Sequence, residues 1–170
     1  SEKRPPYELA LSVKDLDIEK AAEGTVTQGK LNLQAKVKGV GWTLADMNTR
    51  AEVHILPSSV GPVLVKQGAL TATLSENKIR IADATLATDD ATLAVNGELG
   101  LDAKNTGNLD YRLRMTDVSP WLALVKRKGS GAIELSGQAR GNPADLQTQG
   151  MVRLSGLDLD GTVVKAGNIS

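Results

Sequence analysis

Residues that could perform chemistry are few in this chain. His54 is the only histidine, so a Ser-His-Asp arrangement has a single candidate centre and any mechanism with two imidazoles is excluded. His54 alternates in phase with polar neighbours, which predicts a position on the solvated face of a strand. The run Pro57 to Gly61 contains two serines but lacks the Gly-x-Ser-x-Gly spacing of a nucleophile elbow and is interpreted as a loop. We therefore expect no catalytic residue and no enzymatic activity.

Ligand-binding motifs are similarly weak. Gly39-Val40-Gly41 lacks the third glycine and the strand-to-helix context of a phosphate-binding loop. The acidic pairs Asp89/Asp90 and Asp158/Asp160 fall short of the six to eight oxygens that calcium requires, and both are interpreted as solvated turn residues. With no cysteine in the chain, disulfides and thiolate metal sites are excluded. We expect no metal site and no cofactor.

Composition narrows the function further. The chain has 170 residues, 20 basic and 20 acidic, so no basic surface favours nucleic acid. The apolar residues are aliphatic: 23 Leu, 14 Val, 6 Ile and 19 Ala accompany two Trp, two Tyr and no Phe. The longest uninterrupted apolar stretch, Trp121 to Val125, is far below the roughly 20 residues of a membrane span. A smooth aliphatic surface built from repeated thin elements is predicted.

The elements that must form this surface are strands, because period-two alternation recurs along the whole chain. The pattern predicts nine or ten long antiparallel strands joined by tight turns such as Glu76-Asn77 and Thr88-Asp89-Asp90. Shifts in apolar parity between Ile81 and Ala84, and around Gly156, indicate β-bulges or, equally, loops. The fold class expected is all-β: long antiparallel strands curled into an open U-shaped groove with an aliphatic concave face and one or two short helices.

One predicted helix combines capping residues with a tryptophan and a run of cations. Ser119 is expected to be its N-cap, with Pro120 at the first helical position, cations in the last turn and Gly129 at its end. Its tryptophan beside basic residues suits a lipid headgroup region, but two turns would bind a membrane only weakly. We therefore favour a helix that plugs one end of the apolar face through Trp121, Leu122 and Val125.

The chain also matches itself at an offset of about 102 residues. Residues 7–44 fall on 109–146, with identical pairs such as Leu33/Leu135 and Gly39/Gly141. Between the matching strands, the segment Asp17 to Gly24 predicts a weaker copy of the short helix. We interpret the chain, residues 1–170, as a single fragment of a longer repetitive β protein.

The run from Ala51 to Asp102 resembles the repeating pattern of the AsmA-like superfamily, and TamB-type proteins in particular. The likeness lies in a "GALTA" strand, a short turn and the hairpin "KIRIADATLATDDATLAVNGELGLD"; the block from Gly131 to Gly161, with "GMVRLSG" and "LDLDG", is similar. Together these segments cover roughly half of the chain, and they share hydrophobicity and glycine placement rather than catalytic residues.

The resemblance implies a periplasmic segment of an inner-membrane-anchored envelope protein of Gram-negative bacteria. Its groove would carry phospholipids between the inner and outer membranes, with a role in outer-membrane protein assembly beside a TamA-like barrel protein. The alternative is a closed β-solenoid or sandwich module that pairs with a partner through an edge strand. An enzyme or a carbohydrate binder is disfavoured by the scattered aromatic residues and the lone histidine.

If the chain forms a groove, the apolar faces of successive strands must line it. A charge on that face, such as Leu99→Glu, is expected to impair transport while the sheet stays folded. The predicted lining residues are Leu31, Leu33, Val37, Val53, Ile55, Leu70, Leu74, Ile79, Ile81, Leu93, Val95, Leu99, Leu101, Leu113, Met115, Ile133, Leu135, Val152 and Leu154.

Overall fold

The structure is a computed structural model that describes residues 5–21, 28–43, 46–142 and 144–169. Its strands are β1 (Pro6–Asp17), β2 (Gly29–Val40), β3 (Asn48–Ile55), β4 (Ser58–Val60), β5 (Val63–Ser75), β6 (Lys78–Thr88), β7 (Ala91–Gly100), β8 (Gly107–Met115), β9 (Gly129–Asn142), β10 (Asp145–Leu159) and β11 (Thr162–Ile169). The helices are α1 (Ile18–Ala21) and α2 (Ser119–Leu124).

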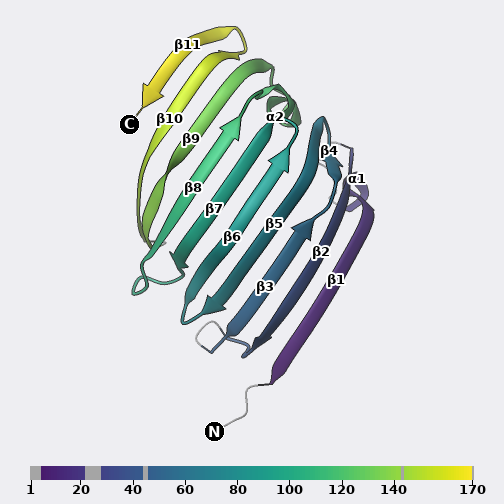
Figure 1. Cartoon of the computed structure of the whole chain (residues 1–170), viewed down its shortest axis with the longest axis vertical. Helices are drawn as coiled ribbons and strands as arrows, with labels where there is room; N and C mark the ends of the chain where they lie inside the picture. Colours follow the sequence, from purple (N-terminus) through teal and green to yellow (C-terminus); the bar gives the residue numbers. More distant parts are fainter. Residues whose placement is uncertain (1–4, 22–27, 44–45, 143, 170) are drawn as a thin grey trace.

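All strands of the described residues belong to one antiparallel sheet. Its order is β1-β2-β3-β5-β6-β7-β8-β9-β10-β11, and the short β4 pairs with β2 and β5 beyond the end of β3. Figure 1 shows the strands side by side as a twisted ribbon, with β1 and β11 at its two edges. The predicted all-β class with long antiparallel strands and very little helix is confirmed.

The sheet has no second layer packed on it within the described residues. None of their side chains is completely buried, and the apolar core is limited to Val63, Ala91, Val118 and Leu157. The chain exposes 11302 Å², whereas a compact monomer of 17.9 kDa is expected to expose about 8,000 Å². The excess is the surface of an uncovered sheet.

The turns explain why consecutive strands are neighbours. Glu76 and Asn77 both have positive φ, 51° and 56°, as a two-residue hairpin turn of type I′ requires. Asp160 and Gly161 repeat this geometry between β10 and β11, with φ of 50° and 89°. Such turns match the right-handed twist of the flanking strands, so the chain runs back and forth across the sheet.

The parity shifts seen in the sequence are bulges, not loops. The register between β6 and β7 slips between Ile81 and Ala84, and that between β9 and β10 slips between Ser155 and Asp158. A further bulge in β1 lies between Val13 and Leu16, where Asp15 adopts a φ of 52°. Each bulge adds a residue, bends the strand and restores the apolar side chains to one face.

Three local predictions are corrected. The segment 58–60, interpreted as a loop, is strand β4, because Ser58 pairs with Val65 and its hydroxyl accepts from the Asn32 amide at 2.9 Å. Helix α2 has Val118 rather than Ser119 at its N-cap; the Asp117 carboxylate accepts from the Ser119 amide and hydroxyl, at 2.8 and 2.5 Å. The helix ends at Leu124, before Lys126 takes a left-handed φ of 57°, rather than at Gly129.

The two segments of the internal repeat occupy the same succession of elements. Strand, short helix and strand occur as β1-α1-β2 and again as β8-α2-β9, and both helices lie at the same end of the strands in Figure 1. The cross-strand register differs by two residues, however: Leu33 faces Val13, whereas its match Leu135 faces Leu113, which is the match of Leu11. Leu44 and residues 22–24, on which part of the prediction falls, lie outside the described residues. The repeat and the longer parent protein stay predictions.

Candidate functional site

The strand register gathers the predicted lining residues on one face of the sheet. Directly paired residues on antiparallel strands point to the same side, so pairing can be followed from strand to strand. One row of partners that crosses the sheet from β1 to β10 consists of Val13, Leu33, Ile55, Gly68, Leu86, Leu93, Leu113, Leu135 and Val152. The register continues from Val152 to position 169 of β11, so the row of paired positions crosses all ten strands of the main path.

The neighbouring rows lie on the same face, which we call the apolar face. One row contains Val53, Leu70 and Val95, and the next contains Val37, Ile81 and Leu109. Toward one end of the strands lie Leu74, Ile79 and Leu99; toward the other lie Leu31, Met115, Ile133 and Leu154. Leu101 follows the end of β7 and has no strand partner.

Sequence reasoning missed several members of this face. Leu86 and Leu109 alternate as clearly as the chosen residues, and Leu9 and Leu11 in β1 do the same. The small residues Ala51, Ala72 and Ala84 also lie on the apolar face. The three alanines were missed because a small, weakly apolar side chain adds little to a hydrophobic pattern, although it widens the space above the sheet.

Exposure differs between the two faces and along the sheet. In β7 and β8 the leucines and valines of the apolar face are half-buried, while Thr92, Ala94, Arg112 and Arg114 on the opposite face are exposed. At the β1 edge the apolar side chains are more exposed: Leu9 is 64% and Leu11 is 52% exposed. Neighbours on both sides, rather than a covering layer, provide the partial burial of the central strands.

The opposite face, which we call the polar face, carries charged side chains that form cross-strand ion pairs. Glu8 contacts Lys38 at 3.0 Å, Arg80 contacts Glu98, and Glu134 lies between Arg114 and Arg153. The hydrogen bond from Lys38 lowers the pKa of Glu8, and that from Arg50 lowers the pKa of Glu52. Exposed pairs of this kind contribute little each, but they keep one face wetted. His54 is exposed between Gln34 and Ala69 on this face, as predicted.

Two tyrosines lie across glycines of the apolar face. The Tyr111 hydroxyl is 2.6 Å from the point where a Cβ on Gly137 would stand and 2.9 Å from that of Gly150. In the same way Tyr7 lies over Gly39 and its hydroxyl hydrogen-bonds the Thr49 hydroxyl. Glycines on the adjacent strands let each ring lie along the sheet instead of standing up from it. The apolar face therefore stays low even where it carries rings.

Both helices cover the same end of the apolar face. Leu122 of α2 places its Cδ1 2.6 Å from the Cβ position of Gly129, and Ile18 of α1 places its Cδ1 3.0 Å from that of Gly29. Trp121 is half-buried, and its indole Nε1 is buried without a hydrogen-bond partner in the described part of the chain. Val125 is 66% exposed. Of the three predicted plug residues, Leu122 thus contacts the sheet, Trp121 is half-buried and Val125 is exposed.

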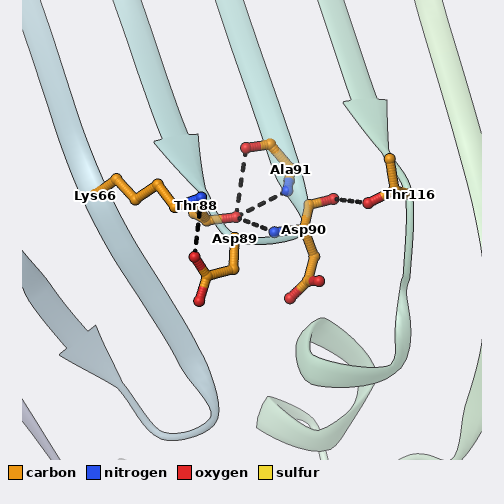
Figure 2. A network of polar contacts seen from close by, with 6 residues as sticks. All are labelled: Lys66, Thr88, Asp89, Asp90, Ala91 and Thr116. Atoms are coloured by element: carbon orange, nitrogen blue, oxygen red, sulfur yellow. Dashed lines mark hydrogen bonds and ion pairs between the residues drawn. The ribbon is translucent and has the colours of Figure 1, made fainter.

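The acidic pairs take part in the turns. Figure 2 shows the β6–β7 turn, in which Asp89 contacts Lys66 at 3.0 Å and the Asp90 carbonyl accepts from Thr116. The buried Thr88 hydroxyl accepts from the Ala91 amide at 2.9 Å, which holds the turn closed. Asp158 accepts from the Gly161 amide. Within the residues that the structure describes, no three side chains of ligating type come together around a metal position.

Comparisons with known proteins return no relative. No protein-family model, curated protein or solved structure matches the chain. Among the described residues, neither helix approaches the length and hydropathy that a bilayer crossing needs.

Proposed function

We propose that this chain is a segment of an AsmA-like, TamB-type groove whose apolar face holds the acyl chains of phospholipids. One observation carries the proposal: a continuous aliphatic face crosses the sheet, and within the described chain only the two short helices at one end lie over it. An apolar patch of this extent on a chain that is otherwise evenly charged is typical of a binding surface.

The free energy of lipid transfer makes such a face useful. At about 0.8 kcal/mol for each CH₂ group, exposing a sixteen-carbon chain to water costs on the order of 13 kcal/mol. Ten strands spaced at roughly 4.8 Å span about 43 Å. One leaflet fills half of a hydrocarbon layer of about 30 Å, so an acyl chain is about 15 Å long. The face is therefore wide enough to hold whole chains laid across the strands.

The character of the surface supports movement along it. Leucine, valine, isoleucine and alanine form an even lining, and the two tyrosines lie over glycines rather than projecting as ridges. The half-burial of the apolar side chains in the central strands fits a sheet that is concave on this side. An acyl chain bound on the apolar face would meet few deep pockets in which it could be trapped.

The cellular setting of the proposal rests on the resemblance described above. In that setting the segment lies in the periplasm, its parent protein is anchored in the inner membrane, and lipid moves between the two membranes. A TamA-like outer-membrane barrel would be the protein partner in outer-membrane protein assembly.

A structural or assembly module is the second candidate. It is favoured by the outer sides of β1 and β11, which have no strand partner in the described chain. Such edges can add a strand from another protein. In this case the apolar face would be closed by further protein instead of lipid.

Native mass spectrometry of the chain purified from a bacterial periplasm, followed by organic extraction, tests the groove. Leu99 lies one residue before the end of β7, so Leu93, which pairs with Leu86 and Leu113, is the more central site for a charge. We expect near-stoichiometric phospholipid on the unmodified chain, its loss in Leu93→Glu and partial loss in Leu99→Glu.

Ala94→Glu is the matched control. Ala94 is the next residue of β7, is exposed on the polar face and pairs with Arg112, so the added carboxylate leaves the apolar face untouched. Ala94→Glu should keep its lipid, and circular dichroism should show a folded sheet in all three variants. A chain that carries no lipid and takes up no fluorescent fatty acid would favour the structural module instead.

A further inference from the structure

The loop that follows α2 is held in place at one end of the strands. Arg127 forms an ion pair with Asp160, and the Asp160 amide donates to the Lys128 carbonyl at 3.1 Å. On the helix itself, Leu122 lies beside Gly129 and Leu159 on the apolar face. We call α2 together with Lys126, Arg127 and Lys128 the α2 corner. It joins an apolar surface to three consecutive cations.

The charges of the α2 corner are only partly compensated. All three cationic residues are exposed, and Arg127 is ion-paired with Asp160. Within the described residues, neither the Lys126 nor the Lys128 side chain forms an ion pair. The other nearby carboxylate, that of Asp158, accepts the Gly161 amide at 2.9 Å and keeps its charge, so two carboxylates lie beside three cations. The corner therefore presents a local excess of positive charge.

The packing of α1 on β2 shows which of these features the helix contact requires. Ile18 lies over Gly29 there much as Leu122 lies over Gly129. The sequence that follows Ile18, however, reads Glu-Lys-Ala-Ala-Glu-Gly and contains neither a tryptophan nor a run of cations. The contact of a short helix with a strand glycine thus forms without a neighbouring tryptophan or run of cations. The cationic run and Trp121 are therefore not required for packing the helix on the sheet.

The position of the corner matches the geometry of a bound lipid. The ends of the strands form the two rims of the apolar face, so a lipid whose chains lie on that face projects its headgroup at a rim. Val125, which is 66% exposed, lies next to Lys126 in the chain, where the apolar residues of α2 give way to the cations. A tryptophan and aliphatic residues beside lysines suit the boundary between acyl chains and phosphate.

We propose that the α2 corner binds the phosphate of an anionic phospholipid whose acyl chains lie on the apolar face. The proposal rests on the function proposed above and adds a preference for headgroup charge. Lys126 and Lys128 contact the phosphate, while the ion pair with Asp160 holds Arg127 and the loop in position. The part of the same rim that carries α1 lacks this preference.

Binding of two lipids with the same acyl chains tests the corner. Phosphatidylglycerol and the uncharged diacylglycerol would be titrated onto the 170-residue chain, onto Lys126→Glu/Lys128→Glu, and onto the control Lys104→Glu/Arg112→Glu. The control changes the net charge by the same amount at two exposed residues outside the corner. Glycerol 3-phosphate would be tested as a free competitor.

The expected result is that the corner variant binds phosphatidylglycerol at least about tenfold more weakly, since each cation near an anionic headgroup contributes appreciably. Its binding of diacylglycerol should be unchanged, and the control should bind both lipids like the unmodified chain. Equal phosphatidylglycerol binding by corner variant and control would overturn the corner while leaving the groove intact. Failure of every protein to bind diacylglycerol would overturn the groove, and the corner with it. Tight binding of glycerol 3-phosphate alone would show a site for a free phosphate and overturn the lipid assignment.

Discussion

Leu122 lies over Gly129 at the junction between α2 and β9, with its Cδ1 2.6 Å from the position of an added Cβ. The same relationship joins Ile18 to Gly29 at α1. In both places a glycine makes room for the aliphatic side chain of a short helix, so the helix can lie on the end of the apolar face. Helices of four and six residues are not stable alone, and this contact keeps them in place.

Gly129→Val should destabilise the chain by about 1 to 3 kcal/mol, because the new side chain meets Leu122 and the Asp158 carbonyl. Urea unfolding followed by circular dichroism measures the loss. Ser130→Val, on the adjacent exposed residue of β9, should change stability by less than about 0.5 kcal/mol. Equal effects of the two substitutions would show that Gly129 is not needed for the packing of α2.

Tyr111 and Gly137 should be energetically coupled. A Cβ at residue 137 meets the Tyr111 hydroxyl at 2.6 Å and the Gln149 carbonyl at 2.4 Å, so Gly137→Ala should be destabilising. In the Gly137→Ala background, Tyr111→Ala should cost less than in the unmodified chain, by about 0.5 to 1.5 kcal/mol. A double-mutant cycle from urea unfolding measures this coupling, and strictly additive effects would contradict the contact.

Acid should weaken the connection to α2. The pKa of Asp117 is lowered from its ordinary value of 3.8 by hydrogen bonds from the Ser119 hydroxyl and amide. Because the pKa of the folded state lies below that of the unfolded state, the stabilisation is present above the ordinary value and is lost as pH falls through the lowered pKa.

Asp117→Asn should therefore reduce stability near neutral pH and flatten its decline below about pH 4. Unfolding midpoints in urea at several pH values measure both effects. Asp90→Asn, in the turn between β6 and β7, is the control, since it removes one carboxylate without removing the acceptor of the Ser119 hydrogen bonds. An unchanged pH profile in Asp117→Asn would contradict the assigned role of this carboxylate.

The exposed edge of β1 should promote self-association. Leu11 is 52% exposed beside unpaired backbone groups, and such edges pair with other chains. Leu11→Lys should weaken association about tenfold or more, because it removes an apolar contact and adds a charge. Sedimentation velocity over a range of concentrations gives the association constant. Ser12→Lys places the same charge on the polar face, and an equal effect from it would mean that edge charge alone governs association.

The sequence by itself determined the strands and their two faces. Alternation in segments such as 109–115 specifies which side chains lie together, and Glu76-Asn77 specifies an antiparallel neighbour, because both signals depend on residues close in the chain. The same local information located the bulge at Ile81 and Ala84, although not whether it was a bulge or a loop. The family resemblance, and the lipid function drawn from it, stay predictions that lipid binding by the chain and its Leu93→Glu variant will test.

The tertiary structure alone decided what lies against each face. Alternation indicates that a face is apolar but not whether a second layer covers it. In the tertiary structure all strands of the described residues join one sheet, so none is left to form a second layer. The strand identity of 58–60, the contact of Asp117 with Ser119 and the position of Tyr111 over Gly137 also depend on neighbours that are distant in sequence or on local backbone geometry. Such contacts leave no periodic signal, because each is fixed by the register of adjacent strands and by one or two individual residues rather than by a repeating pattern.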